Sequence, residues 1–491
     1  MSAIASPSDQ PLGGGRDAAA QDGQPASAPM PQGRRRTELL MLAFVVGVVM
    51  LAYANVGLGL NGKVPAGMFA YGLSFAALVG AAHVAVRWLA PWADPLLLPL
   101  AALLNGLGIV MIYRLQLAGR GGNPGVQIST MSSNTTAFQV AYSAAGIAAF
   151  VAVLALVRQP RTLQRYTYTL GAIGLVLLAL PALLPNSISE VPGTTAKIQI
   201  SLGGFTVQPE EFAKLALAVF FAGYLVAKRD VLALAGRRVL GIDLPRARDL
   251  GPVLIAWGAS LVVLIFESDI GTSALFFGLF VVMMYIATQR SSWLIIGFLL
   301  FVFGSVVTAE LFQHVRDRFI VWLDPFKYVH TVVPSSFQLV QGLYGMGFGG
   351  VLGRGLGQGA PYNTPLVQSD FIITAFGEEL GLTGVMALLI IYGLIVQRGL
   401  RAAIAVRDPF SKLLAGGLAF VVALQVFVIV GGVTRLIPLT GITTPFLSQG
   451  GSSLISSWMG IALLMRISDT ARRPAPQPIQ DEGMTQVVRA G

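Results

Sequence analysis

The chain has 491 residues, of which 54% are hydrophobic and only 11% are charged. Soluble domains carry about 25% charged residues, so this composition excludes an ordinary soluble protein and indicates a polytopic membrane protein. The formal net charge is +10, but the Lys and Arg residues lie in short segments between apolar runs, which indicates orientation in a bilayer and no nucleic-acid partner. The chain has no cysteine, which excludes thiol catalysis, disulfides and thiolate metal sites.

The two ends of the chain have the composition of tails. Residues 1–38 are rich in Ala, Gly, Pro, Ser and Gln and contain Arg34, Arg35 and Arg36 just before the first apolar run. This pattern predicts a disordered cytoplasmic tail. Residues 468–491 contain several prolines and predict a second disordered tail.

Apolar runs of about 17–25 residues between these tails predict transmembrane helices. We expect twelve, which makes an all-α polytopic fold, near 39–58, 67–89, 95–117, 137–157, 166–184, 207–227, 251–266, 270–288, 292–312, 371–397, 412–433 and 445–467. The loops after the fourth, sixth, eighth and tenth runs hold most of the loop Lys and Arg residues. These loops and both termini are therefore predicted to be cytoplasmic.

This topology places one long extracytoplasmic loop at 313–370. Connections of this length in compact proteins are usually functional or disordered. Aromatic residues such as Trp322, Phe337 and Tyr344 favour a packed structure, with short helices at the membrane interface. Twelve spans also suit a secondary transporter, but no internal repeat supports that class.

Asp370 lies where this loop meets an apolar run, in the string SDFIITAFGEELG. An acid at membrane depth costs about 2.5–3.5 kcal/mol, so its presence needs a reason. One interpretation is an acid that caps a helix and stays ionised in the field of the helix dipole. The other is a functional carboxylate, with Glu378 and Glu379 two to three turns further on.

Two more polar clusters interrupt apolar sequence. In QPEEFAK, Glu211 and Lys214 are three residues apart and can pair on one helical face. The pair either holds two helices together or shapes a substrate site. In SDIGT, Asp269 precedes Gly271 and Thr272, which predicts a helix N-cap; the alternative is a site for a cation or for an ion bound to pyrophosphate.

The segment from Arg316 to Gly359 is rich in glycine. It contains a GxGxxG string, but no strand precedes it and no Lys-Ser/Thr follows, so a nucleotide loop is not predicted. Dense glycine instead exposes backbone N–H groups that can wrap a phosphate or sugar. Arg318, Lys327 and Arg354 either supply positive charge to such an anion or extend along the membrane interface.

The last cluster, TGITTPFLSQGGSSLISS, places Ser448, Ser452 and Ser453 before the final apolar run, beside Arg435. Its small residues either permit close helix packing or line a polar pocket.

The strings QPEEFAK, SDIGT, the block from Arg318 to Gly359, SDFIITAFGEELG and TGITTPFLSQGGSS occur in this order. In this order they resemble the signature motifs of the SEDS family, represented by FtsW, RodA and SpoVE, over about residues 190–467. The resemblance implies a multi-pass protein of the bacterial plasma membrane that polymerises lipid II outside the membrane, alongside a class B penicillin-binding protein (a transpeptidase), in cell shape or division. The family core has ten helices with the QPSE helix fourth. Here that helix is sixth, which implies two extra N-terminal spans.

The resemblance divides the chain into the tail 1–38, N-terminal helices at 39–185, a catalytic core at 186–467 and the tail 468–491. It places the family's essential aspartate at Asp370. The residues expected to bind substrate or support the site are Glu211, Lys214, Asp269, Arg318, Gln338, Gln341, Arg354, Glu378, Arg435, Ser448, Ser452 and Ser453. Many relatives carry a Glu three residues before the aspartate, where this chain has Val367, so any helper role of that Glu is missing.

Glycan polymerisation requires a base for the acceptor hydroxyl and positive charge for the leaving pyrophosphate. Asp370 is the expected base. No cofactor is firmly predicted: a divalent cation such as Mg or Mn is an open expectation, with Asp269 or Asp370 as ligand, and no metal site is assigned. Two other functions stay open, a lipid II flippase or transporter and a non-catalytic scaffold for a transpeptidase.

Overall fold

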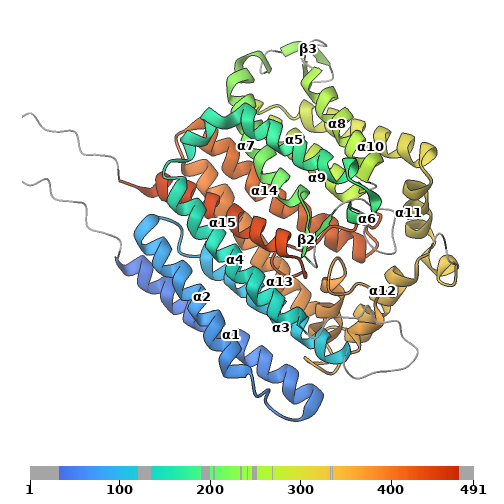
Figure 1. The fold of residues 1–491 in the computed structure, drawn as a ribbon. Helices are drawn as coiled ribbons and strands as arrows, with labels where there is room; N and C mark the ends of the chain where they lie inside the picture. Colours follow the sequence, from blue (N-terminus) through green and yellow to red (C-terminus); the bar gives the residue numbers. More distant parts are fainter. Residues whose placement is uncertain are drawn as a thin grey trace, which may run out of the picture. The chain divides into compact units, whose positions relative to one another are not determined.

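The computed structural model describes residues 32–119, 134–189, 199–202, 205–232, 235–239, 242–245, 251–267, 269–331, 333 and 335–474. Within these ranges twelve helices have 17 or more residues, and each overlaps one predicted apolar run. They are α1 (Gln32–Asn61), α2 (Met68–Leu89), α3 (Leu97–Gly119), α4 (Thr135–Leu156), α5 (Thr167–Leu183), α7 (Glu210–Leu232), α8 (Gly251–Glu267), α9 (Ile270–Thr288), α10 (Ser292–Leu311), α13 (Ile372–Ala405), α14 (Pro409–Val433) and α15 (Gly451–Arg472). The all-α polytopic fold is therefore confirmed (Figure 1).

Shorter elements fill the connections between these helices. The segment 313–370 folds into α11 (Gln313–Leu323), the 3₁₀ helix η3 (Pro325–Tyr328), α12 (Phe337–Gly349) and η4 (Pro361–Asn363). The others are η1 (Pro160–Tyr166), α6 (Asn186–Ser189) and two antiparallel hairpins, β1 (Ile200–Leu202) with β2 (Phe205–Val207) and β3 (Ala235–Val239) with β4 (Ile242–Pro245). The long loop is thus packed structure, as its aromatic residues indicated.

Nine segments of the described chain are long and apolar enough to cross a membrane, by length and composition alone. The helices that do not meet both conditions are α7, α8 and α15. Helix α8 has 17 residues, and α7 begins with Glu210 and Glu211. The number of spans and their orientation therefore stay predictions.

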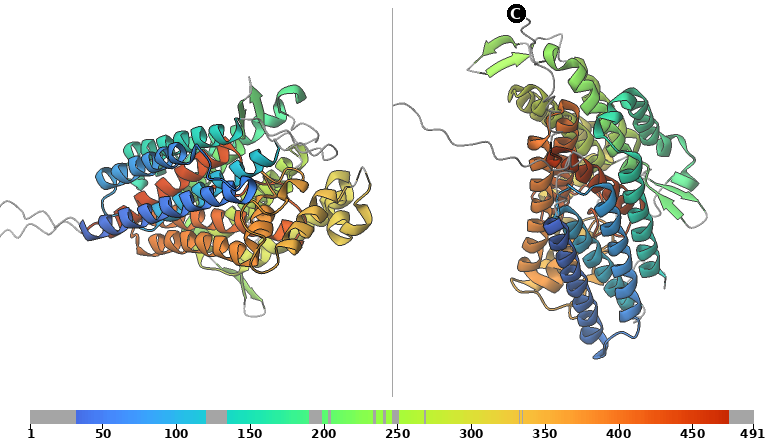
Figure 2. Two further views of the ribbon diagram at one scale, coloured as in Figure 1. Left: turned by 90° about the horizontal axis from the view of Figure 1, so that it is seen from below. Right: turned by 90° about the vertical axis from the view of Figure 1, so that its left-hand side faces the viewer.

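Helices of similar hydropathy occupy different depths in the fold. The most apolar 18-residue stretches of α9 and α10 have similar mean hydropathies, 2.1 and 2.3. In α9, however, 67% of this stretch is buried inside the protein, whereas in α10 only 17% is buried. Helix α9 packs against α7, α8, α10 and α14, whereas α10 packs against α8, α9 and α11 (Figures 1 and 2). A helix that is apolar on every side suits either protein or lipid neighbours.

Helices α1 and α2 pack against each other and against α3 and α4 (Figure 1). Helix α1 begins at Gln32, inside the segment 1–38 predicted as a tail. The reason is a buried ionic cluster: Glu38 accepts hydrogen bonds from Arg35 and, at 2.8 Å, from Nδ1 of His83 on α2. Arg35 also donates to backbone oxygens after α2, including Ala93 O at 2.5 Å. At the other end of the chain, α15 continues to Arg472, beyond the predicted boundary at 467.

Helix α13 is interrupted at Gly381, whose φ is 67°. The residues just after α12 replace the missing helical hydrogen bonds. Leu382 N and Thr383 N donate to Gly350 O and Val351 O at 2.9 and 3.1 Å, while Arg354 N and Gly355 N donate to Glu378 O and Glu379 O at 3.0 and 2.8 Å. All four backbone groups stay paired, as a water-poor environment requires.

Glycine is required at this break. A Cβ at Gly381 would lie 2.3 Å from Gly353 N and 2.5 Å from Val351 O. We expect Gly381→Ala to destabilise the protein by at least about 1–3 kcal/mol, because an L residue is strained at this φ and the clash adds to that strain. The thermal unfolding midpoint in detergent measures the effect. Gly393→Ala on the same helix, where a Cβ meets nothing within 4 Å, is the control, and equal midpoints for the two variants would contradict the prediction.

Candidate active site

Asp370 lies on the turn that leads into α13 and is only 9% exposed to solvent. The N-cap position of α13 is Phe371, and no side chain makes a capping hydrogen bond there. The interpretation of Asp370 as a helix cap is therefore wrong. Its carboxylate instead accepts a hydrogen bond from Ser369 Oγ, 3.1 Å from Oδ1.

Burial raises the pKa of Asp370 to about 6. The Ser369 hydroxyl, the backbone N–H of Asp370, the charge of Arg318 and the Gln338 amide each oppose this rise. Desolvation thus outweighs the stabilising groups. A pKa near 6 still leaves most of the carboxylate ionised at neutral pH.

Asp370 is unusual among the buried acids. The described residues include eight buried carboxylates: Glu38, Asp94, Glu211, Asp269, Asp370, Glu378, Glu379 and Asp469. The other seven each have an ion pair or a hydrogen bond from the backbone N–H of another residue. Among the described residues, Asp370 has no ion pair and accepts no hydrogen bond from the backbone N–H of another residue. A buried carboxylate with spare acceptor capacity is chemically suited to take a proton.

Helices α11 and α12 bring the polar groups near Asp370. Arg318 on α11 is half-buried and donates from Nη1 to Leu439 O at 2.9 Å. Gln338 on α12 donates to Pro365 O at 3.0 Å. Gln341 lies one helical turn after Gln338 and is also half-buried. The structure therefore brings Arg318 and Gln338 close to Asp370.

The segment between α14 and α15 holds the Asp370 turn in place. Ser448 Oγ donates to Ser369 O and accepts from Thr444 N at 2.8 Å. Gln449 N donates to Gln368 O at 2.8 Å. Ser448 is thus a positioning residue for the turn.

Glu211 and Lys214 form the predicted ion pair and are both buried. Ser456 Oγ donates to Glu211 at 2.9 Å, and Lys214 Nζ donates to Gln425 Oε1 at 3.2 Å. The pair therefore links α7, α14 and α15, which supports the structural interpretation. Sequence reasoning missed Gln425, although it is a lone amide in the apolar run 412–433.

Two serines of the last motif belong to this same region. Ser453 Oγ accepts a hydrogen bond from Thr443 Oγ1 at 3.0 Å, and Thr443 O accepts one from the Gln425 amide at 2.8 Å. Ser452 Oγ accepts from Gln208 N at 2.9 Å. These contacts connect the start of α15 to the segment after α14 and to the residue just before α7.

Asp269 caps α9, as its spacing predicted. One carboxylate oxygen accepts from Gly271 N at 2.8 Å, and the other accepts from Thr272 Oγ1 at 2.7 Å. Gly271 allows the segment after α14 to approach, because a Cβ there would lie 3.0 Å from the Cβ of Thr440. Among the described residues no three His, Asp or Glu side chains gather around either Asp269 or Asp370, and a divalent cation at this site stays a prediction.

Glu378 and Glu379 hold the glycine-rich segment after α12. Glu378 accepts from Ala360 N at 2.6 Å, and Glu379 accepts from Gly357 N at 3.1 Å. Arg114 on α3 donates to Glu379 at 2.7 Å and to Gly359 O at 2.7 Å. Arg114 was not predicted, although a lone arginine in the apolar run 95–117 is the signal that indicates it.

The two other predicted site arginines, Arg435 and Arg354, contact other parts of the fold. Arg435 donates to Trp322 O and Leu323 O at 2.9 and 2.6 Å, and so ties the end of α14 to α11. Arg354 is exposed, and its guanidinium lies 5.4 Å from the ring centre of Phe348. The structure does not bring these two guanidinium groups into contact with Asp370.

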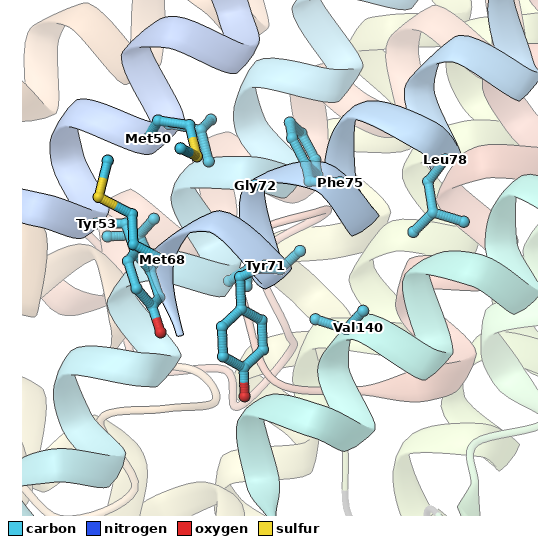
Figure 3. A pocket seen from close by; sticks show the side chains of 11 residues that line it. Met50, Tyr53, Met68, Tyr71, Gly72, Phe75, Leu78 and Val140 are labelled. Atoms are coloured by element: carbon cyan, nitrogen blue, oxygen red, sulfur yellow. The ribbon is translucent and has the colours of Figure 1, made fainter. Parts of the chain in front are cut away.

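A small apolar pocket lies between α1, α2, α3 and α4 (Figure 3). Its lining consists of Val49, Met50, Tyr53, Met68, Tyr71, Gly72, Phe75, Leu78, Ile109, Val110 and Val140. None of these residues is a candidate site residue, and none carries a charge. The pocket is therefore separate from the carboxylate chemistry.

Comparison with known proteins decides the family. A model of the FtsW, RodA and SpoVE family, described as "Cell cycle protein", matches residues 94–473. The chain belongs to this family. The peptidoglycan glycosyltransferase RodA of Mycobacterium tuberculosis (strain H37Rv) is 48% identical over 446 residues, which cover 91% of this chain and 92% of that protein.

Two further matches are more distant. The stage V sporulation protein E of Bacillus subtilis is 32% identical over 275 residues, which cover 56% of this chain and 71% of that protein. The solved structure "Structural coordination of polymerization and crosslinking by a peptidoglycan synthase complex" has a TM-score of 0.51 at 24% identity and covers 83% of this chain and 98% of that chain. This last likeness shows the fold alone.

Every motif that suggested the resemblance lies within the residues that the family model matches. The match begins at residue 94, after the end of α2. Helices α1 and α2 therefore lie outside the region that the family model covers.

The buried ion pair can be tested by a double-mutant cycle. We expect Glu211→Gln and Lys214→Met each to destabilise the protein by about 3–5 kcal/mol, because each leaves one buried charge without its partner. The double variant should lose less than the sum of the two. Unfolding in detergent measures all three, with Glu310→Gln, at the exposed pair with Arg316, as the control. Additive losses would show that the two charges do not depend on each other.

Proposed function

We propose that this member of the FtsW, RodA and SpoVE family is a peptidoglycan glycosyltransferase that polymerises lipid II, with Asp370 as general base. The observation that carries the assignment is the state of Asp370: it is buried, it has no ion pair among the described residues, and its pKa is raised to about 6. A base is most effective when its pKa lies near the working pH. The name of the relative from Mycobacterium tuberculosis supports the reaction class.

In the proposed reaction, a sugar hydroxyl of one substrate attacks the anomeric carbon of another. Asp370 accepts the hydroxyl proton as the new C–O bond forms. The bond between the anomeric carbon and the pyrophosphate oxygen breaks, and undecaprenyl pyrophosphate leaves with the electron pair, so the anomeric configuration inverts. The leaving group is already a weak base, which is why no second carboxylate has to protonate it.

Arg318 is the cation best placed to support this step. Its charge acts on Asp370, and its anchoring to Leu439 O keeps it near the carboxylate. Arginine can bind phosphate oxygens with two parallel hydrogen bonds. We assign it to the pyrophosphate, where it offsets charge that develops during bond cleavage. No step is assigned to a divalent cation.

The proposal also includes location and partner. The active site is placed at the extracytoplasmic face of the bacterial plasma membrane, because the loop charges orient 313–370 to that side. A class B penicillin-binding protein is the proposed partner, and the synthase complex of similar fold, which coordinates polymerisation with crosslinking, supports this. The role is in cell shape, elongation or division.

Replacement of the base tests the assignment directly. We expect Asp370→Asn to reduce glycan polymerisation from purified lipid II about 10²–10⁴-fold, since general-base catalysis contributes that much. Asp317→Asn, at an acid on α11 that accepts a hydrogen bond from Gln313, should retain activity. Gel analysis of the glycan products with the transpeptidase partner present measures both. Normal polymer from Asp370→Asn would overturn the role of this carboxylate.

The same preparation distinguishes the other functions. Lipid II movement across liposomes without polymer, unaffected by Asp370→Asn, would support a flippase. An intact complex with the transpeptidase that has neither activity would support a scaffold.

The pH profile tests the protonation state. Because the pKa of Asp370 is raised to about 6, the base is protonated and inactive below that pH. We expect kcat/KM to fall about tenfold per pH unit as the pH drops below about 6 and to level off above it. Rates measured from pH 4.5 to 8, with stability followed in parallel, test this. An acidic limb centred near the ordinary value of a carboxylate, about 4, would contradict it.

A further inference from the structure

The C-terminal end of α1 contacts the glycine-rich segment that is bound to Glu378 and Glu379 on α13. Gln358 Nε2 donates to Gly59 O at 2.9 Å. The two backbones are in close contact, because a Cβ at Gly59 would lie 2.4 Å from Leu356 O and 3.3 Å from Gly357 Cα. A Cβ at Gly357, whose φ is 85°, would in turn lie 3.0 Å from Val56 O. Side chains larger than hydrogen do not fit at this contact.

The contacted segment is bound to the helix half that follows Asp370. Gly357 N donates to Glu379, Ala360 N donates to Glu378, and Arg114 bridges Glu379 to Gly359 O. Both acids lie on α13 before its break at Gly381. A shift of residues 356–358 would therefore remove donors from two buried carboxylates on the helix that Asp370 precedes.

Helix α1 reaches the same acids by a second route. The Tyr53 ring on α1 stacks on the Tyr113 ring on α3, with centroids 4.3 Å apart. Arg114, the ion-pair partner of Glu379, is the next residue after Tyr113. Tyr53 also lines the apolar pocket in Figure 3. Helix α1 thus supports the site from two sides, through the glycine-rich segment and through α3.

The opposite end of α1 is anchored. Glu38 is fully buried and pairs with Arg35 and His83, and Arg35 donates to Ala90 O and Ala93 O. These contacts join α1 to α2 and to the segment that leads into α3. Because α1 is a rigid helix held at its N-terminal end, the position of its C-terminal end is fixed as well.

We infer that α1 is a positioning element for the active site, which sets the place of residues 356–358 through the contact between Gly59 and Gln358. Gly59 and Gln358 are positioning residues that act on the proposed base through Glu378 and Glu379. The inference rests on the proposed function and gives a role to helices that lie outside the family match.

The experiment compares glycine variants on one helix. In Gly59→Val the new side chain collides with Leu356 O, whereas in Gly47→Val it enters open space, since nothing lies within 4 Å of a Cβ there. We expect kcat at saturating lipid II to fall at least about tenfold in Gly59→Val with KM nearly unchanged, since misplacing catalytic groups by about 1 Å costs about 100-fold. Gly47→Val should keep both constants.

Gln358 provides a variant that does not threaten folding, because its side chain is exposed. Gln358→Ala should lower kcat in the same direction, and Gln358→Lys, which keeps a donor, should restore it. Wild-type kcat in both Gly59→Val and Gln358→Ala would overturn the inference. A loss in Gly59→Val alone would also overturn it, because it would indicate misfolding of α1.

A readout independent of activity completes the test. Amide hydrogen exchange at Gly357 and Ala360, whose N–H groups bond Glu379 and Glu378, should accelerate in Gly59→Val and not in Gly47→Val. Unchanged exchange would overturn the inference even if the rate falls. Wild-type protein that makes no polymer, or an active Asp370→Asn variant, would refute the proposed function instead, so the two failures can be told apart.

Discussion

The fold around Asp370, the proposed base, depends on the exchange of backbone hydrogen bonds at Gly381. Where α13 breaks, Glu378 O and Glu379 O lose their helical donors, and Arg354 N and Gly355 N replace them. The exchange brings the glycine-rich segment against the helix half that follows Asp370. Helix α3, through Arg114, and helix α1, through Gly59, then contact that segment.

Burial of charge explains why the paired acids stabilise the fold while Asp370 is proposed to take part in the reaction. Glu211, Asp269 and Glu379 are saturated by Lys214, by backbone and hydroxyl donors, and by Arg114 respectively. Saturated acids stabilise contacts between helices, because breaking any of them exposes a charge to an apolar interior. Asp370 is buried without such saturation, and burial raises its pKa to about 6. Among the buried acids of the described chain, Asp370 is thus the one that keeps spare capacity to accept a proton.

Local sequence predicted most features that depend on neighbouring residues. The Glu211–Lys214 pair and the Asp269 cap follow from spacings of two to three residues, and both were confirmed. The cap interpretation of Asp370 failed because Phe371 occupies the capping position. Arg114 and Gln425 were missed because their partners are 265 and 211 residues away along the chain. Hydropathy also could not separate the buried α9 from the peripheral α10, because the same apolar surface suits protein and lipid.

The sequence by itself determined the helical membrane fold, the order of the motifs and the family, because hydropathy and motif spacing are properties of the linear chain. The tertiary structure alone decided which acids are paired, that Asp370 has no ion pair among the described residues, and that α1 touches the segment bound to Glu378 and Glu379. The physical reason is that desolvation and ion pairing depend on what surrounds a side chain in space. Those neighbours come from helices far apart in the sequence.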